Sequence, residues 1–536
     1  MNKQQLANKI WASANKMRSK IDANEYKDYI LGLIFYKFLC DNEEQYLRKD
    51  GWTDEDMPFL VEDYEDANAK DTIEYCKNNI GYFIEYKYLF STWLKPDSMF
   101  NVADLSAALN NFDRLVSANY RSVYEKIFLT LQAGLSKLGE NPASQTRALK
   151  DLIKLIKDIP TDGSQDYDVL GYVYEYLIGN FAANAGKKAG EFYTPHEVAI
   201  LMSEIVAEHH KAKETIEIYD PTSGSGSLLI TIGKSVGRHI EDKNKVKYYA
   251  QELKENTYNL TRMNLVMRGI KPNNINARCA DSLDEDWPVQ AGDMSKPLYV
   301  DAVVSNPPYS QHWNPTDAEM DSRFKDYGVA PKSKADYAFL LHELHHIKPD
   351  GILTIVLPHG VLFRGDPEKD VDGEGKIRKN LIEKNNIDAI IGLPANIFFG
   401  TGIPTLIMVL KQHRDNDDQQ VHYDNSYGLH GSNGTYVENV NQTWCLVFKV
   451  KRIGIEVDTS ADFIIDIHKY ITKKLMSQLG WGKITKERLE FLNNILKNKT
   501  LKVICRDLSI APIYRNFVPL EYDNWETALD TILFKS

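Results

Sequence analysis

The stretch TIEIYDPTSGSGSLLITIGKSVGRHI, residues 215–240, joins a strand pattern to a helix pattern through a loop of glycine and serine. Its first six residues form a short apolar run that ends in an acid, as a buried strand does. Glycines between a strand and a helix let the backbone approach a ligand closely, with the helix N-terminus pointing at it. The stretch therefore predicts one strand–loop–helix unit, although a plain tight turn between strand and helix would use the same residues.

This loop does not have the pattern of a P-loop, the common phosphate-binding loop of nucleotide hydrolases. A P-loop needs a glycine five residues before its Gly-Lys pair, and Leu228 stands at that place before Gly233 and Lys234. The Gly-Lys pair also falls in the middle of the predicted helix, where it could not cradle a phosphate.

Short apolar runs of the same kind recur through the middle of the chain. They are TIEIYD, VKYYAQE, NINARCAD, YVDAVVSN, GILTIVLP, IDAIIGLP and TLIMVLK. Amphipathic helical stretches separate most of them. Strands that alternate with helices predict an α/β fold with a Rossmann-like, doubly wound parallel sheet. In such sheets, ligands bind outside the carboxyl ends of the strands.

Changes of pattern along the chain predict three parts. Residues 1–165 carry apolar side chains at three- and four-residue steps, as in EYKDYILGLIFYKFLCDNEEQYL, and predict an all-helical N-terminal domain. The turn-rich stretch 159–168 marks its end. Residues 166–415 hold the predicted sheet. Residues 416–536 follow a polar linker and predict a partly helical C-terminal region.

The composition is that of an ordinary soluble globular protein, with 43% apolar and 26% charged residues. No run approaches the roughly eighteen apolar residues that a membrane helix needs, and the N-terminus lacks the apolar core of a secretion signal. The five scattered cysteines form no CxxC motif and predict reduced thiols in a cytoplasm. The net charge of −11 argues against a protein that wraps nucleic acid over its whole surface, but it is compatible with local DNA contact or with a basic partner.

Acidic residues follow the second and third predicted strands. Glu252 ends YAQE, where a carboxylate could accept hydrogen bonds from both hydroxyls of a ribose. Asp281 ends NINARCAD, where it could accept from the exocyclic amine of an adenine. Either acid alone would be a solvated strand end, but with the glycine loop before them they indicate a cofactor that contains a nucleoside.

The fourth strand ends in an unusually stiff turn, Asn306-Pro307-Pro308-Tyr309. Two consecutive prolines can continue neither a central strand nor a helix interior. The asparagine oxygen and a proline carbonyl, both immobilised, can accept the two hydrogens of one amino group. The tyrosine ring offers a stacking face that offsets part of the few kcal/mol needed to pull a base from a duplex. The turn therefore suits a flat substrate that carries an amino group.

The ordered set GEFYTP, DPTSGSGS, QE, ADSL and NPPY resembles that of the S-adenosylmethionine-dependent N6-adenine DNA methyltransferases. The helical N-terminal region and the segment FFGTGIPTLIMVLK narrow the resemblance to the modification subunits of type I restriction–modification systems, over most of the chain. NPPY by itself also occurs in protein-glutamine methyltransferases, whereas the full ordered set is far more specific.

The resemblance implies a role for each of these motifs. The turn Asn306-Pro307-Pro308-Tyr309 would hold the target adenine, with either Phe398 or Phe399 stacked on its other face. Glu252 would bind the ribose of S-adenosyl-L-methionine and Asp281 its adenine. The implied cofactor-binding residues are Glu191, Phe192, Tyr193, Thr194, Pro195, His196, Asp220, Thr222, Ser223, Gly224, Ser225, Gly226, Glu252 and Asp281. No metal is expected, because methyl transfer is an in-line displacement driven mainly by positioning.

The resemblance also implies the activity and the partners. The chain would methylate N6 of a flipped-out adenine in double-stranded DNA, as the catalytic modification subunit of a type I enzyme in the cytoplasm. Only eighteen residues separate Asp281 from Val300, too few for a DNA-reading domain. A separate specificity subunit would therefore read the target, with two modification subunits on each specificity subunit and a restriction subunit in the full complex.

Four other hypotheses stay open at this point. The runner-up is a solitary adenine methyltransferase that reads DNA with its own C-terminal region. A protein-glutamine methyltransferase would share the Asn-Pro-Pro-Tyr turn. A catalytically inactive scaffold disagrees with the intact turn and glycine loop. Finally, HELHH at 342–346 satisfies the H-E-x-x-H pattern of zinc proteases, but its helix runs directly into a buried strand and we expect no third ligand nearby.

Overall fold

The computed structural model describes residues 5–8, 10–11, 23–161, 169, 172–173, 176, 194–240, 242–365, 373–393, 397–398 and 403–413. The chain divides into two compact units. Unit 1 comprises Met1–Ala189, Ser223–Ile230 and Lys247–Ala280, and unit 2 comprises Gly190–Thr222, Thr231–Val246 and Asp281–Ser536. The predicted domain boundaries at 165 and 415 stay predictions, and the predicted C-terminal region 416–536 lies outside the described residues.

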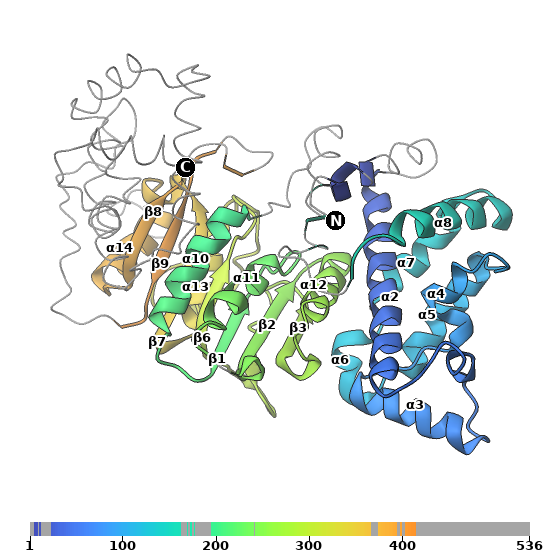
Figure 1. The fold of residues 1–536 in the computed structure, drawn as a ribbon. Coiled ribbons are helices and arrows are strands. Elements are labelled where there is room, and N and C mark those ends of the chain that lie inside the picture. The colour runs from blue at the N-terminus through green and yellow to red at the C-terminus, as the bar shows by residue number, and fades with distance from the viewer. Residues whose placement is uncertain are drawn as a thin grey trace, which may run out of the picture. The chain divides into compact units, whose positions relative to one another are not determined.

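Unit 1 begins with a helical part, as the sequence predicts. Its helices are α2 (Ala23–Lys49), α3 (Ala67–Asn79), α4 (Phe90–Trp93), α5 (Val102–Leu115), α6 (Arg121–Tyr124), α7 (Leu129–Gly134) and α8 (Pro142–Ile156). The long helix α2 runs through this part and packs against α4, α7 and α8 (Figure 1). Its apolar face is buried throughout, with Ile30, Ile34 and Phe35 fully enclosed.

Two of these helices begin at asparagine caps. Asn101 accepts hydrogen bonds from the backbone N–H groups of Ala103 and Asp104, and the Asp104 carboxylate caps Asn101 in return. Asn141 accepts from the N–H of Ser144 and is followed by Pro142, a residue suited to the first helical position. Such capping satisfies N–H groups that have no partner inside the helix.

The strands form a seven-stranded sheet in the order β3-β2-β1-β6-β7-β9-β8. Their bounds are β1 (Ile216–Asp220), β2 (Val246–Glu252), β3 (Ile275–Cys279), β6 (Val300–Ser305), β7 (Ile347–Pro358), β8 (Ile387–Gly392) and β9 (Thr405–Leu410). All six residues of β6 are buried, as the nearly unbroken apolar run predicts for a central strand. The predicted α/β fold class is therefore confirmed, together with the helical N-terminal part.

One strand departs from the predicted parallel sheet. β1, β6 and β7 pair in parallel within unit 2, and β2 and β3 do so within unit 1. β9, however, pairs antiparallel with both β7 and β8. β9 follows β8 in the chain and pairs with it as an antiparallel neighbour, an arrangement that needs no crossover helix.

A small hairpin precedes β6. It pairs β4 (Val289–Gln290) with β5 (Asp293–Pro297) and lies in the eighteen-residue segment between Asp281 and Val300. The hairpin was not predicted, because its short strands show no apolar alternation: three of the five residues of β5 are exposed.

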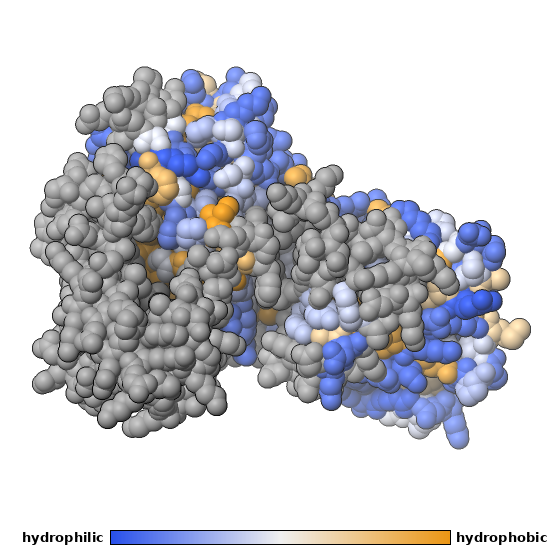
Figure 2. All heavy atoms as spheres, turned by 90° about the horizontal axis from the view of Figure 1, so that it is seen from above, coloured by the Kyte–Doolittle hydropathy of each residue, from blue (hydrophilic) through white to orange (hydrophobic). Residues whose placement is uncertain are grey.

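The remaining helices are α10 (His196–His209), α11 (Ser227–Val236), α12 (Glu255–Met267), α13 (Asp336–His345) and α14 (Glu374–Glu383). In unit 2, α10 and α13 both pack on β7. Among the coloured residues of Figure 2, hydrophilic side chains predominate on the visible face. No helix within the described ranges is long and apolar enough to cross a membrane.

Candidate active site

In unit 2, side chains from the end of β1 and from the loop after β3 hold the backbone at the end of β1. The buried Asp220 carboxylate accepts a hydrogen bond from the N–H of Thr222, 2.9 Å away. The Ser282 hydroxyl donates to the carbonyl of Pro221 over 2.5 Å. The Thr222 hydroxyl is buried and has no hydrogen-bond partner within the described part of the chain. The loop is thus fixed while one buried hydroxyl remains available to a ligand.

In unit 1, the glycine–serine loop is held against α12. The Thr261 hydroxyl donates to the carbonyl of Gly224 (2.7 Å), and the Asn264 amide donates to the carbonyl of Ser225 (2.9 Å). Gly224 and Gly226 have φ angles of +54° and +77°. A Cβ at Gly226 would lie 3.3 Å from the Thr261 methyl. The conformation of this loop therefore favours glycine at both positions.

Glu252 and the glycine loop form one unit of structure. The Gly224 N–H donates to Glu252 Oε2 (3.1 Å), and the Lys254 N–H donates to Oε1 (3.1 Å). A carboxylate has about four lone-pair sites, so accepting these two backbone bonds is compatible with the ribose-binding role predicted for Glu252. The next residue, Leu253, is 55% exposed at the end of β2. No sequence pattern distinguishes Leu253, because single exposed apolar residues are common on protein surfaces.

Asp281 begins a short turn after β3. Its Oδ1 accepts from the N–H of Leu283 over 2.9 Å. This bond fixes the side chain in an Asx turn and leaves lone pairs on the carboxylate for another donor. The turn around Asp281 is thus rigid before any ligand arrives.

The catalytic candidates lie directly after β6 in unit 2. The Tyr309 hydroxyl donates to Asn306 Oδ1 over 2.7 Å. Burial, with the charge of Asp336 nearby, raises the pKa of Tyr309 well above its usual value, so the hydroxyl stays protonated and remains a donor. The Ser310 N–H donates to Asp336 Oδ1 (2.7 Å), and this bond anchors the turn to the start of α13.

Of the two candidate phenylalanines, the described residues include only Phe398. The ring of Phe398 lies 6.0 Å from that of Tyr309, edge to face at 84°, and Phe398 is buried. Phe399 lies outside the described residues, as do Glu191, Phe192 and Tyr193 of the GEFYTP motif. Thr194 is half-buried and Pro195 is buried just before α10, whereas His196 is exposed on its first turn.

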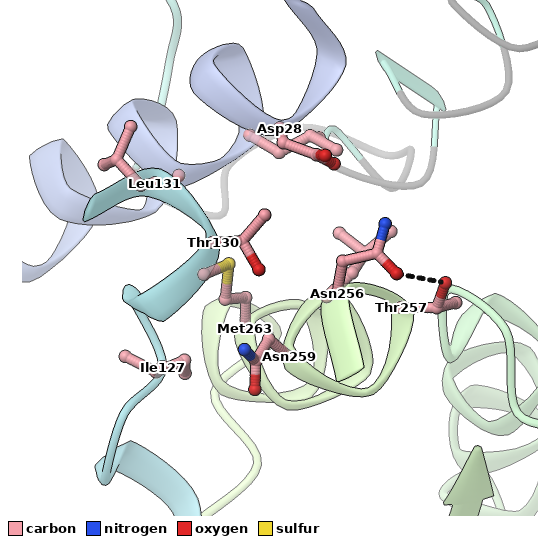
Figure 3. A pocket seen from close by; sticks show the side chains of 11 residues that line it. Asp28, Ile127, Thr130, Leu131, Asn256, Thr257, Asn259 and Met263 are labelled. Carbon is pink, nitrogen blue, oxygen red and sulfur yellow. Dashed lines mark hydrogen bonds between the residues drawn. The ribbon is translucent and has the colours of Figure 1, made fainter. Parts of the chain in front are cut away.

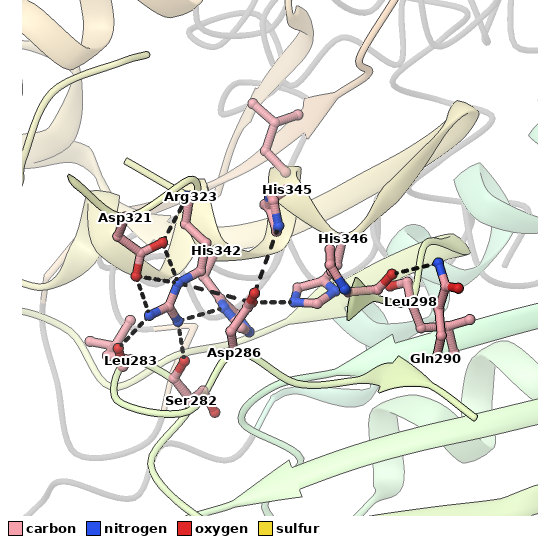
Figure 4. A network of polar contacts seen from close by, with 12 residues as sticks. Ser282, Leu283, Asp286, Gln290, Leu298, Asp321, Arg323, His342, His345 and His346 are labelled. Carbon is pink, nitrogen blue, oxygen red and sulfur yellow. Dashed lines mark hydrogen bonds and ion pairs between the residues drawn. The ribbon is translucent and has the colours of Figure 1, made fainter. Parts of the chain in front are cut away.

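The HELHH motif is built into the core. Glu343 is fully buried, and its Oε1 accepts from the Ser305 hydroxyl (2.6 Å) directly before Asn306. Burial raises the pKa of Glu343 well above its usual value. The expectation that no third ligand lies near the histidines was wrong: Asp286 Oδ1 is 3.0 Å from Nε2 of His346 (Figure 4). The loop that carries Asp286 is far from the motif in sequence, so no spacing could reveal it.

A small hollow in unit 1 contains none of the predicted site residues. It lies between α2, the segment 127–131 and α12, and Asp28, Thr130, Asn256 and Asn259 line it (Figure 3). Nearby, the buried Arg262 guanidinium of α12 donates to the carbonyls of Ser122 and Glu125. These bonds tie α12 to the helical part of unit 1.

Comparison with known proteins places the chain in a family. The family model described as N-6 DNA methylase matches residues 165–441, and the HsdM N-terminal domain matches residues 6–156. The type I restriction enzyme MpnII methylase subunit of Mycoplasma pneumoniae is 36% identical over 430 residues, which cover 76% of this chain and 77% of that protein. The MjaIX methylase subunit of Methanocaldococcus jannaschii is 25% identical over 430 residues, 76% of this chain and 69% of that protein.

A solved structure agrees with these relatives. The methyltransferase subunit of the type I restriction–modification system of Streptococcus thermophilus is 39% identical in sequence and superposes with a TM-score of 0.66. The match covers 78% of this chain and 86% of that one. The sheet, with its glycine loop after β1 and its Asn-Pro-Pro-Tyr turn after β6, defines the class: a Rossmann-like methyltransferase. The chain belongs to the N-6 DNA methylase family, among the methylase subunits of type I restriction enzymes. It is accordingly an adenine-specific DNA methyltransferase.

Proposed function

We propose that this chain transfers a methyl group from S-adenosyl-L-methionine to N6 of an adenine flipped out of duplex DNA. The observation that carries the proposal is the turn after β6, where Asn306 Oδ1 already accepts a hydrogen bond from a donor 2.7 Å away. Tyr309 and Phe398 provide aromatic surfaces beside it. An acceptor and flat apolar faces are the groups that recognise an extruded base.

The proposed methyl transfer depends on how the Asn-Pro-Pro-Tyr turn binds the amino group of the adenine. Asn306 Oδ1 and the carbonyl of Pro307 accept the two hydrogens of the adenine amine, which directs its lone pair away from both oxygens. The Tyr309 hydroxyl must first give up its bond to Asn306. A new bond then forms from N6 to the methyl carbon, the bond from that carbon to sulfur breaks, and a proton leaves N6 for solvent. Positioning supplies most of the acceleration in such a displacement.

The residues present suit the cofactor, which supplies the activated methyl group when bound. The positive-φ glycines of the loop leave room for close backbone approach, the Thr222 hydroxyl is buried without a partner within the described ranges, and Glu252 offers carboxylate lone pairs. We assign Glu252 to the ribose, Asp281 to the adenine, and Leu253 to the apolar face of that adenine. The GEFYTP residues 190–195 would complete the methionine end.

The partners follow from family membership and from charge. We propose that a separate specificity subunit reads the DNA sequence, that two copies of this chain serve each specificity subunit, and that a restriction subunit joins the full cytoplasmic complex. Residues 1–165 would contact DNA and partners, residues 166–415 would catalyse, and residues 416–536 would dock the specificity subunit. The net charge of −11 supports a separate DNA-reading subunit, because a protein of that charge attracts DNA poorly by itself.

The test is transfer of tritium from labelled S-adenosylmethionine to duplex DNA, by the chain alone and with its specificity subunit. Label on adenine N6 only in the mixture supports the proposal. Label on DNA from the chain alone would favour the solitary adenine methyltransferase. If neither sample labels DNA although the cofactor binds, the result would favour protein substrates.

The matched control is Asn306→Ala. We expect turnover to fall by a factor of about 10²–10³ while cofactor affinity stays nearly constant, because the amide acts on the base. Equilibrium dialysis with labelled cofactor checks the second part. A large loss of cofactor affinity would show that Asn306 is assigned to the wrong half of the site.

A further inference from the structure

The proposed function gives no role to a buried polar cluster in unit 2 (Figure 4). Four of its members are Asp286, Arg323, His342 and His346. They come from the loop after β3, the segment after the catalytic turn, α13, and the residue that caps the end of α13. Arg323 is only 5% exposed, and both histidines are fully buried. Burying an arginine is costly unless all its N–H groups find acceptors, so its contacts indicate what it is there to hold.

The guanidinium of Arg323 donates hydrogen bonds to two consecutive backbone carbonyls. Its Nη1 donates to the carbonyl of Ser282 and its Nη2 to the carbonyl of Leu283, both over 3.0 Å. The Asp321 carboxylate accepts from the same guanidinium at Nε (3.0 Å) and at Nη2 (2.7 Å). The planar fork of arginine can reach all these acceptors together, which the ammonium of lysine cannot.

The two carbonyls belong to the turn that carries Asp281. Within that turn the Leu283 N–H donates to Asp281 Oδ1, and the Ser282 hydroxyl donates to Pro221 at the end of β1. Arg323 therefore holds two carbonyls of the same turn whose Leu283 N–H orients the Asp281 carboxylate. Only Ser282 lies between Leu283, whose carbonyl binds Arg323, and Asp281, which would bind the cofactor adenine.

Hydrogen bonding rather than a metal ion accounts for the cluster. His342 accepts from Arg323 at Nδ1 (3.2 Å), so its Nε2 carries the proton and donates to the Tyr219 hydroxyl (2.9 Å). His346 uses Nδ1 on the carbonyl of Leu298 (2.9 Å) and Nε2 on Asp286. Every ring nitrogen of the pair thus has a protein partner. A guanidinium cation within hydrogen-bonding distance of His342 would also repel a metal cation.

We infer that Arg323 is a positioning residue, which sets the Asp281 carboxylate to accept a hydrogen bond from the exocyclic amine of the cofactor adenine. This inference rests on the proposed function, because it takes Asp281 as the adenine-binding acid. It adds a residue that does not touch the cofactor, and it assigns that residue one readout: preference for adenine over a purine without the amine.

The experiment compares binding of two ligands to the full chain by equilibrium dialysis. S-adenosylhomocysteine carries the exocyclic amine, and S-inosylhomocysteine carries an oxygen in its place. We expect the native protein to bind the adenosyl ligand about tenfold or more tightly than the inosyl ligand, because one charge-assisted hydrogen bond is lost. Asp281→Asn should remove this preference.

Arg323→Lys is the decisive variant. It should lower the preference toward that of Asp281→Asn, mainly by weakening the adenosyl ligand, while affinity for the inosyl ligand changes little. Arg238→Lys is the matched control, because Arg238 lies half-exposed in an ion pair with Glu204 and should keep the full preference. A merely structural role for Arg323 would weaken both ligands equally, and that result overturns the inference.

The remaining outcomes are also decisive. If the native protein shows no preference for the adenosyl ligand, the assignment of Asp281 fails, and with it that part of the proposed function. If Asp281→Asn loses the preference but Arg323→Lys keeps it, only the inference about Arg323 fails. Should Arg323→Lys not fold, Asp321→Asn retains the guanidinium but loosens its anchor, and an unchanged preference in that variant would contradict the inference.

Discussion

At the scale of single residues, the Tyr309 hydroxyl donates to Asn306 Oδ1 over 2.7 Å. In the proposed reaction, this hydroxyl would occupy the acceptor that the adenine amine needs, and the tyrosine ring would be the stacking surface. Two properties of one side chain would therefore act in opposite directions on substrate binding, and two substitutions can separate them.

We expect Tyr309→Ala to raise the DNA KM roughly tenfold, because it removes a stacking contact. Tyr309→Phe should leave that KM unchanged or lower it, because the ring remains and the competing donor is gone. Steady-state methylation at saturating cofactor measures both. Equal losses in the two variants would mean that the hydroxyl, not the ring, contributes the binding.

Gly226 offers a second test at this scale. Gly226→Ala adds a Cβ 3.3 Å from Thr261 at a φ of +77°, whereas Gly269→Ala meets a similar φ of +75° with nothing within 4 Å. The left-handed conformation costs each variant about 1–2 kcal/mol of folding free energy. Only Gly226→Ala should also weaken S-adenosylmethionine binding, as dialysis would detect. Similar affinities in both variants would exclude the glycine loop from the cofactor site.

At the scale of elements, the junction between α10 and β6 is sensitive to acid. His210 ends α10, is 4% exposed, and donates from Nε2 to the carbonyl of Asp301 in β6 (2.8 Å). Burial, followed by the charge of His209, lowers the pKa of His210 from 6.5 to about 4. The unfolded chain therefore binds more protons between these values, and the stability that neutral His210 contributes is lost as the pH falls through this window.

The expected loss from this one histidine is about 3 kcal/mol of unfolding free energy between pH 6.5 and pH 4. His210→Gln keeps an amide donor for Asp301 but does not titrate. Its melting temperature should therefore fall less steeply with acid than that of the native protein. Parallel curves for the two proteins between pH 7 and pH 5 would show that His210 does not carry the effect.

At the scale of the whole molecule, the family assignment predicts an assembly. We expect deletion of the residues after Asp458 to abolish co-purification with the specificity subunit while S-adenosylmethionine binding is retained, because the proposed cofactor residues lie within 190–281. Pull-down with a tagged specificity subunit measures the first property and dialysis the second. A complex that survives the deletion would place the docking surface elsewhere in the chain.

The sequence by itself determined the fold class, the family and the order of the motifs. Apolar runs that alternate with helical stretches report burial directly, and glycines and prolines act on the backbone locally, so such features are legible without a fold. The strand pattern of β6 and the stiff turn after it were correctly predicted for this reason. The direction of β9 was not correctly predicted, because it depends on which strands β9 pairs with rather than on its own residues.

Only the tertiary structure decided which distant residues meet. It brought Asp286 to His346, Arg323 to the turn of Asp281, and Phe398 to Tyr309. These contacts join segments separated by tens of residues, and no local pattern records them. The HELHH motif is a further example. Its buried polar residues match a metal-binding pattern in sequence, but their hydrogen-bond partners come from distant segments and are identified only in the folded structure.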